Sequence, residues 1–286
     1  MAKSIDEFTQ WDSVIVPKRV WFDLDLKALW SYRDLIKMFV RRNLVALYKH
    51  TVLGPFWYVL QSLLTILIYM FIFGGLAGLG TEGVPKPLFY MSGILMWNYF
   101  NDCFSATNNF LVTNANLFGK VYFPRLVLPI SSALSSLGRM SVQFMLFLVI
   151  YFWCISIDAA IYPNWTLLLF PVYFVMLALF GISWGLLVTS FTYKYRDLQI
   201  LITYFLQLLM YATPIVYPLE VIPEKYRLFI SLNPLSPLFD AFKYGWLGTS
   251  NFSWLSLGYS FLCMMVFLIV SLLIFNRVEQ NYMDTV

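Results

Sequence analysis

The stretch Leu29–Gln61, LWSYRDLIKMFVRRNLVALYKHTVLGPFWYVLQ, decides the fold, because a basic segment runs without a linker into an uncharged one. At about 100° per residue, Arg33, Lys37 and Arg41 fall on one helical stripe beside Arg42, and apolar side chains take the opposite face. Residues 52–78 carry no charged side chain, which is long enough to cross a hydrocarbon core of about 30 Å. The pattern predicts an amphipathic interfacial helix that turns into a membrane span, rather than a soluble helix packed on a core.

Composition places the whole chain in a membrane. Of its 286 residues, 60% are hydrophobic and 12% are charged, against about 25% charged in soluble domains. The net charge of +4 is therefore no sign of nucleic-acid binding; the positions of the basic residues matter instead. Cys103, Cys154 and Cys263 lack metal or redox spacing, and His50 is the single histidine. The sequence predicts a polytopic membrane protein without a metal site.

Six apolar segments are long enough to span the bilayer. They lie near residues 52–78, 88–112, 128–156, 165–191, 198–217 and 254–275. Backbone groups in lipid must be paired within the segment, and the alternating pattern of a barrel is missing from these segments. We therefore predict an all-α polytopic fold with six transmembrane helices.

The distribution of Lys and Arg predicts the orientation. With the N-terminus inside, the inner segments hold fourteen basic residues and the outer segments four, with Arg139 inside a span. Residues 1–19 mix both charges and have no apolar core, so we expect no signal peptide. Both termini are thus predicted to be cytoplasmic, in a multi-pass membrane protein. The predicted parts are a lead-in at 1–28, the interfacial helix at 29–50, a six-span domain at 51–276 and a tail at 277–286.

The last outer loop, residues 218–253, is long and rich in apolar and aromatic residues. Pro223, Pro234, Pro237 and Gly245 interrupt it. Because proline stops helices, we predict two or three short re-entrant helices that dip into the outer leaflet. An ordinary surface cap is the alternative.

Polar residues occur inside two of the predicted spans. The second span carries them on one helical face, and the third span carries them four residues apart: Asn98, Asn101, Asp102, Ser105, Asn108 and Asn109 in the second, and Ser131, Ser135, Arg139 and Gln143 in the third. Such side chains face other helices or a wet cavity. The pattern is consistent with the lining of a path for a hydrophilic substrate and with hydrogen bonding between helices.

Asp102 and Arg139 are the opposite charges placed inside these spans. The two spans are antiparallel and share one inner loop, so both charges reach a similar depth. An isolated charge there costs at least about 2.5–3.5 kcal/mol. We predict an ion pair beside the substrate path; the alternative is that each charge is solvated separately.

Sequence motifs for an energy source or a catalytic centre are missing. The pair Gly119–Lys120 is followed by Val121 and Tyr122, so it is not part of a G-x-x-x-x-G-K-[ST] phosphate loop. Neither a nucleophile elbow nor a Cys/His pairing occurs. A secondary transporter would show two related halves, which the sequence lacks. A membrane enzyme acting on lipid-linked sugars remains an alternative to a transport subunit.

From about Leu29 to the C-terminus, the chain carries motifs that resemble those of a known family. The motifs are Tyr32-Arg33-Asp34-Leu35, Val45-x-x-Tyr48-Lys49-x-Thr51-x-Leu53-Gly54-Pro55-x-Trp57, Gly119-Lys120-Val121-Tyr122-Phe123-Pro124-Arg125, Tyr195-Arg196-Asp197 and Asn233-Pro234-Leu235-Ser236-Pro237. They resemble ABC-2 type permeases that export polysaccharides, most closely those for lipid-linked O-antigen glycans and more distantly teichoic acid exporters.

The resemblance implies a homodimer in the bacterial inner membrane that works with two copies of a separate ATPase subunit. That partner would bind ATP and Mg, and this chain would hold no cofactor of its own. The resemblance assigns contact with the ATPase to the inner loops, at Lys120, Tyr122, Phe123, Pro124, Arg125, Tyr195, Arg196 and Asp197. Proline and aromatic residues there favour a short rigid knob that docks in a cleft of the partner. An external gate is implied before the last span, at Pro223, Asn233, Pro234 and Pro237.

Overall fold

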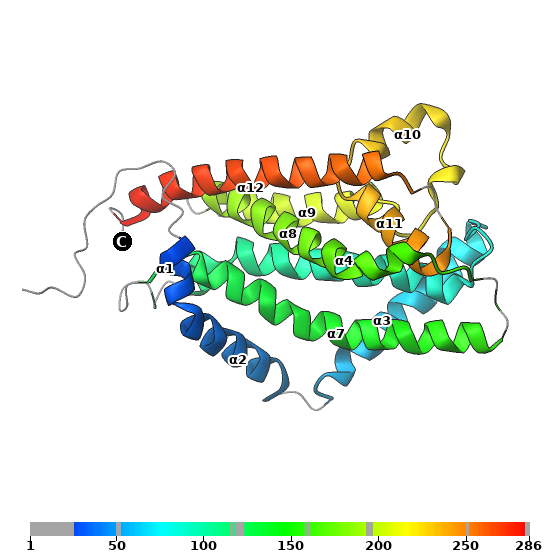
Figure 1. Cartoon of the computed structure of the whole chain (residues 1–286), viewed down its shortest axis with the longest axis horizontal. Helices are drawn as coiled ribbons and strands as arrows, with labels where there is room; N and C mark the ends of the chain where they lie inside the picture. Colours follow the sequence, from blue (N-terminus) through cyan, green and yellow to red (C-terminus); the bar gives the residue numbers. More distant parts are fainter. Residues whose placement is uncertain are drawn as a thin grey trace, which may run out of the picture.

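The computed structural model describes residues 26–49, 53–114, 117, 123–157, 159, 161–192, 197–249 and 252–283. Within those ranges every regular element is a helix, in agreement with the predicted all-α class. The long helices run along the molecule, with α1 and the last turns of α12 at one end and α10 at the other (Figure 1). We name these the inner end and the outer end, following the predicted orientation.

The first half of the chain forms α1 (Leu26–Ser31), α2 (Arg33–Lys49), α3 (Phe56–Tyr69), the π-helix η2 (Met70–Leu76), α4 (Lys86–Asn108), α5 (Phe110–Thr113) and α7 (Val127–Ser156). The second half forms η3 (Trp165–Leu169), α8 (Phe170–Thr192), α9 (Leu198–Tyr211), η4 (Leu219–Val221), α10 (Glu224–Ser231), α11 (Ser236–Leu247) and α12 (Trp254–Met283).

Four helical segments are long and apolar enough to cross a membrane: Phe56–Leu76, Val127–Ser156, Trp165–Thr192 and Trp254–Val278. The other two predicted spans differ from these for separate reasons. α4 has the length, about 35 Å at 1.5 Å per residue, but its polar residues lower its hydropathy. α9 is apolar but covers only about 21 Å. Length and composition therefore support four spans, and the count of six stays a prediction.

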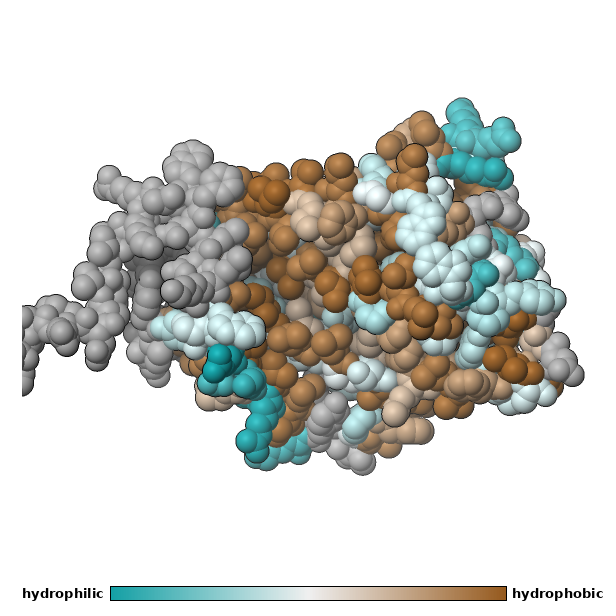
Figure 2. Space-filling view, in the orientation of Figure 1, coloured by the Kyte–Doolittle hydropathy of each residue, from teal (hydrophilic) through white to brown (hydrophobic). Residues whose placement is uncertain are grey.

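The surface shows a wide apolar band over the middle of the bundle (Figure 2). Hydrophilic residues gather over α10 at the outer end and over α2 toward the inner end. Side chains such as Val149, Leu262 and Leu208 are largely exposed. Exposing so large an apolar surface to water is unfavourable, whereas lipid tails are as apolar as leucine and can cover it. The chain is therefore a multi-pass membrane protein.

α4 is the central helix and packs against α8, α7, α3 and α11. Every side chain from Leu88 to Trp97 is buried. A Cβ atom at Gly181 of α8 would lie 2.7 Å from Cβ of Cys103, and one at Gly185 would lie 2.5 Å from Cβ of Thr107. Glycines four residues apart let two helices approach closely within a membrane. This contact fixes how α4 is rotated about its axis.

α2 packs along α7 toward the inner end. Phe39 is buried, whereas Lys37 and Arg41 are exposed. Asn43, the polar residue on the apolar side, donates from Nδ2 to Ser135 Oγ of α7 at 3.3 Å. This exception to the apolar pattern is therefore a contact that holds α2 on α7.

The predicted fifth span is too long at its C-terminal end. We expected it to reach Tyr217, but α9 ends at Tyr211. Pro214 lacks an N–H, and the residue before a proline disfavours helical backbone angles. The helix therefore stops before the proline.

Two boundaries at the ends of the chain also differ from the prediction. The helix expected over 29–50 is interrupted at Tyr32, which separates α1 from α2. α12 continues beyond Phe275 to Met283, into the predicted tail. Arg, Glu and Gln in this part favour helix, so the helix does not stop where the apolar run stops.

The outer loop 218–253 forms the short helices η4, α10 and α11, within the predicted number. α11 is mostly buried, while α10 has no buried side chain. Gly248 ends α11 in the left-handed region at φ 74°, where a Cβ atom would also lie 2.3 Å from the Tyr162 carbonyl oxygen. The depth of these helices in a membrane stays a prediction.

Candidate functional site

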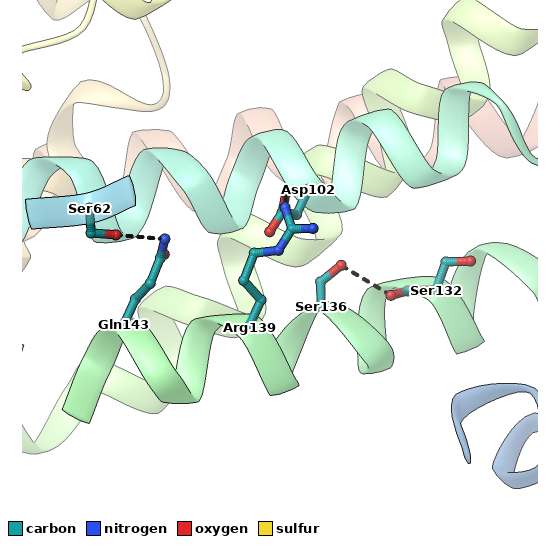
Figure 3. Close-up of polar contacts among 6 residues, drawn as sticks. All are labelled: Ser62, Asp102, Ser132, Ser136, Arg139 and Gln143. Atoms are coloured by element: carbon teal, nitrogen blue, oxygen red, sulfur yellow. Dashed lines mark hydrogen bonds and ion pairs between the residues drawn. The ribbon is translucent and has the colours of Figure 1, made fainter. Parts of the chain in front are cut away.

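The polar residues of α4 face two different neighbours. The carboxylate of Asp102 points toward α7 (Figure 3), whereas Asn101, Ser105 and Asn108 line a cleft between α4 and α9. Consecutive helical residues are about 100° apart, so one narrow face cannot hold both groups. The expected single polar face on α4 is therefore corrected: α7 contacts the carboxylate, and α9 faces the amides and the hydroxyl.

The predicted ion pair between Asp102 and Arg139 is confirmed. Nη1 of Arg139 lies 2.6 Å from Oδ1 of Asp102, and the side chains are 34% and 15% exposed, respectively. Such a contact is a charge-assisted hydrogen bond, stronger than a neutral one. The alternative, in which each charge is solvated separately, is wrong.

Two more contacts join α7 to α3 beside this pair. The guanidinium carbon of Arg139 lies 4.5 Å from the ring centroid of Tyr58. One turn further, Gln143 donates from Nε2 to Ser62 Oγ at 3.0 Å, and both residues are buried (Figure 3). Polar contacts therefore connect three helices, α3, α4 and α7, in the middle of the apolar bundle.

The serine hydroxyls of α7 bond backbone carbonyl oxygens of the same helix. Ser131 donates to the Leu128 carbonyl oxygen at 2.9 Å, and Ser135 donates to the Ser131 carbonyl oxygen at 2.6 Å. Ser136 bonds the Ser132 carbonyl oxygen in the same way, at 3.1 Å (Figure 3). Such backward bonds satisfy the hydroxyl locally. For α7, hydrogen bonding within and between helices accounts for the polar pattern.

The cleft between α4 and α9 has a volume of about 440 Å³. α9 contributes Gln199, Thr203 and Gln207, which are four residues apart and therefore form one stripe. Gln199 donates from Nε2 to Oδ1 of Asn109, which bridges the two helices. Apolar walls complete the cleft: Trp97, Phe104, Ile202, Leu206 and Met210. Asn98 is not among the lining residues.

The chemistry of this cleft is neutral and polar. Its polar side chains are amides and hydroxyls, and none of its described lining residues is charged. An amide or a hydroxyl both donates and accepts hydrogen bonds. The arrangement therefore fits a ligand that is rich in hydroxyl groups.

Two features of this region were missed by the reasoning from sequence. Gln199, Thr203 and Gln207 recur every four residues within an apolar run. This spacing predicts a polar stripe on one face of the helix and can be read from the sequence. The pair Gly181 and Gly185 is a G-x-x-x-G motif on a membrane helix, which marks a close helix contact. Both lie in predicted spans.

The inner loop does not form the expected projecting knob at Phe123 and Arg125. Their exposed fractions are 6% and 4%. The Phe123 ring centroid lies 5.9 Å from that of Phe39 on α2, because an apolar partner is available within the chain. Pro124 is half-buried and Asp197 is exposed at the start of α9. The other predicted coupling residues lie outside the described part of the chain: Lys120, Tyr122, Tyr195 and Arg196.

The predicted gate residues lie between α9 and α12. Asn233 donates from Nδ2 to Thr213 Oγ1 at 2.9 Å, just after α9. The Pro234 carbonyl oxygen accepts a hydrogen bond from Ser260 Oγ of α12 at 2.7 Å. Pro223 precedes α10, and Pro237 lies in the first turn of α11, where a missing N–H has no cost.

The described residues contain no group of three His, Cys, Asp or Glu side chains that could hold a metal ion.

The sequence profile of the family described as ABC-2 type transporter matches residues 34–247, which run from α2 through α11. The chain is 28% identical over 221 residues to the O-antigen export system permease protein RfbA of Myxococcus xanthus, covering 76% of this chain and 82% of that protein. It is 27% identical over 255 residues to the protein of the same name from Klebsiella pneumoniae, covering 88% and 94%. The matched residues include the ion pair and the α4–α9 cleft, and the chain belongs to the ABC-2 type transporter family.

Proposed function

We propose that the chain is the transmembrane subunit of an ATP-driven exporter that moves a lipid-linked polysaccharide, of the O-antigen kind, from the cytoplasm to the outer side of the inner membrane. The observation that carries the proposal is the neutral polar cleft between α4 and α9 in an apolar bundle. Its amides and hydroxyls match the hydroxyl groups of a glycan. Both relatives are named as O-antigen export permeases, which supports the substrate class.

Membership of the family implies an ABC ATPase as partner. In our proposal two ATPase subunits bind ATP and Mg and act on a homodimer of this chain, whose substrate path lies at or beside the subunit interface. Arg33, Lys37, Arg41 and Arg42 face the cytoplasm and the anionic lipid headgroups, where each basic residue contributes on the order of 1 kcal/mol. The short helices of residues 218–253 act as the external gate.

A chain of contacts gives the ATPase a mechanical route to the cleft. The inner loop packs on α2 through Phe123 and Phe39. α2 is bonded to α7 through Asn43, and α7 is tied to α4 by the ion pair of Arg139 with Asp102. A displacement of the inner loop would therefore reach α4, which forms one wall of the cleft.

Deleting the gene tests this proposal. We expect the cell surface to lose its polysaccharide while the lipid-linked glycan accumulates inside, and the wild-type gene to restore export. Gln207→Leu, in the cleft, should reduce export several-fold because a leucine neither donates nor accepts hydrogen bonds. Gln61→Leu is the matched control, since Gln61 is an exposed glutamine of α3 outside the cleft. Unchanged export in the deletion strain would contradict the proposal.

Copurification tests the ATPase partner. We expect the tagged chain to bring down a nucleotide-binding subunit in equal amount. If the lone chain instead modifies lipid-linked sugars, the membrane-enzyme alternative is correct. Accumulation of a lipid-linked teichoic acid in the deletion strain would replace the O-antigen class by that substrate.

A further inference from the structure

A second cleft of about 340 Å³ opens at the outer end, between α10, α11 and the start of α12. It shares no lining residue with the α4–α9 cleft. Its walls are rich in hydroxyl groups: Ser231, Ser236, Ser253, Ser256 and Tyr259. Among these, Ser253 and Ser256 donate no hydrogen bond to any described residue. The cleft therefore offers hydroxyl groups to a ligand.

One carboxylate faces this cleft. Asp240 of α11 lines it, although only 8% of the residue is exposed. No hydrogen bond reaches the carboxylate from the described residues. An ionised carboxylate accepts about four hydrogen bonds, and leaving it buried without them is costly. Asp240 is therefore placed to accept hydrogen bonds from a molecule in the cleft.

The nearest cation is committed elsewhere. Lys243 lies one turn further along α11, and its Nζ donates to the Pro214 carbonyl oxygen at 2.7 Å and lies 3.9 Å from the ring centroid of Phe89. Its charge acts on Asp240 through space without occupying the cleft. The ammonium group thus anchors α11 to the bundle and leaves the carboxylate available.

A cluster of aromatic rings reaches the same cleft through Phe252. Phe252 lines the cleft, stacks on Tyr244 with ring centroids 5.2 Å apart, and meets Trp254 edge-on at 5.0 Å. Trp254 in turn stacks on Trp165 at 5.6 Å. Sugar rings present apolar C–H faces to aromatic rings and hydroxyl groups to carboxylates. The cleft combines both partners.

We propose that the cleft between α10, α11 and α12 binds a saccharide unit, with Asp240 accepting hydrogen bonds from sugar hydroxyls and Phe252 forming an apolar wall. The saccharide belongs to the exported glycan, and in this respect the inference rests on the proposed function. Ca²⁺ takes six to eight oxygen ligands, usually several of them carboxylates, whereas one described carboxylate lines this cleft. A lipid tail would leave Asp240 without a hydrogen-bond donor.

The test uses the full chain in lipid nanodiscs. The probe is the cell-surface polysaccharide of a strain that carries the gene, released from its lipid by mild acid. Saturation-transfer NMR on the glycan protons measures the Kd. We expect saturable binding that Asp240→Ala weakens about tenfold or more, because a charged acceptor is lost.

Two further variants separate loss of the binding site from loss of the fold. Ser256→Phe fills the cleft without altering α11, and we expect it to weaken binding as Asp240→Ala does, even where the latter variant unfolds. Glu224→Gln removes an exposed carboxylate of α10 that does not line the cleft, and it should bind the glycan like the wild type. Thermal unfolding in the same discs checks that each variant is folded.

Binding of the glycan should also depend on pH. Burial raises the pKa of Asp240 to about 7, with Lys243 opposing and Glu82 adding to this rise, and burial lowers the pKa of Lys243. Sugar hydroxyls donate to the ionised carboxylate, so affinity should rise as the pH increases through about 7. Asp240→Asn should remove this dependence.

The outcomes separate the site from the exporter. No binding by the wild type, or equal binding by the wild type and both cleft variants, overturns the site, and so does Asp240-dependent binding of Ca²⁺ without binding of glycan. If the cells export glycan while the cleft binds none, the site is wrong and the proposed function stands. If the discs bind the glycan while the cells do not export it, the site stands and the proposed function is wrong.

Discussion

Reversing the charges of Asp102 and Arg139 tests how α4 is held in the bundle. Asp102→Arg would place two guanidinium groups together, and Arg139→Asp would place two carboxylates together. Removing one partner of a buried pair costs about 3–5 kcal/mol. Arg139 is 34% exposed and keeps Tyr58 beside it, so we expect about 2–3 kcal/mol for neutralising either partner and more for either reversal. The double reversal should recover most of this loss.

The measurement is a double-mutant cycle on thermal unfolding in nanodiscs, combined with export in cells. Ser141→Ala on α7 is a suitable control, because Ser141 is exposed and, among the residues that the structure describes, its hydroxyl bonds only the Leu137 carbonyl oxygen of its own helix. Each single reversal should also lower export, since α4 lines the cleft. A double reversal no more stable than the worse single variant would refute a direct interaction between these charges.

Three further predictions each test a single contact within the bundle. Gly185→Ala adds a Cβ atom 2.5 Å from that of Thr107, so it should lower stability by about 1–3 kcal/mol. Gly258→Ala has open space around it within helix α12 and should not lower the melting temperature. Lys86→Met removes the 2.7 Å bond from Nζ to the Gly74 carbonyl oxygen, so amide exchange in η2 should speed up roughly tenfold or more; equal protection would contradict this. Phe123→Ala should uncouple ATP hydrolysis from export while the exposed-ring control Phe191→Ala does not; normal coupling in Phe123→Ala would exclude the α2 contact from transmission.

Local properties of the sequence were enough to predict the helices and their order. Uncharged runs predicted four of the long helices, and α7 and α4 were predicted correctly as helices although they contain Arg139 and a series of polar residues, respectively. The Asp102–Arg139 pair was also within reach of the sequence, because two antiparallel helices joined by one loop bring residues at equal depth together. The end of α9 was missed by six residues, although Pro214 marks it.

Which neighbour each helix face meets was decided by the tertiary structure alone. The series on α4 predicted a polar face but not that Asn101 would meet α9 while Asp102 met α7. That choice depends on the rotation of α4, which the close contact with Gly181 and Gly185 of α8 sets. The sequence likewise predicted that Phe123 would contact a partner protein, whereas in the structure its ring packs against Phe39 of α2. A periodic pattern records that the faces of one helix differ, whereas the partner of each face follows from packing all helices together.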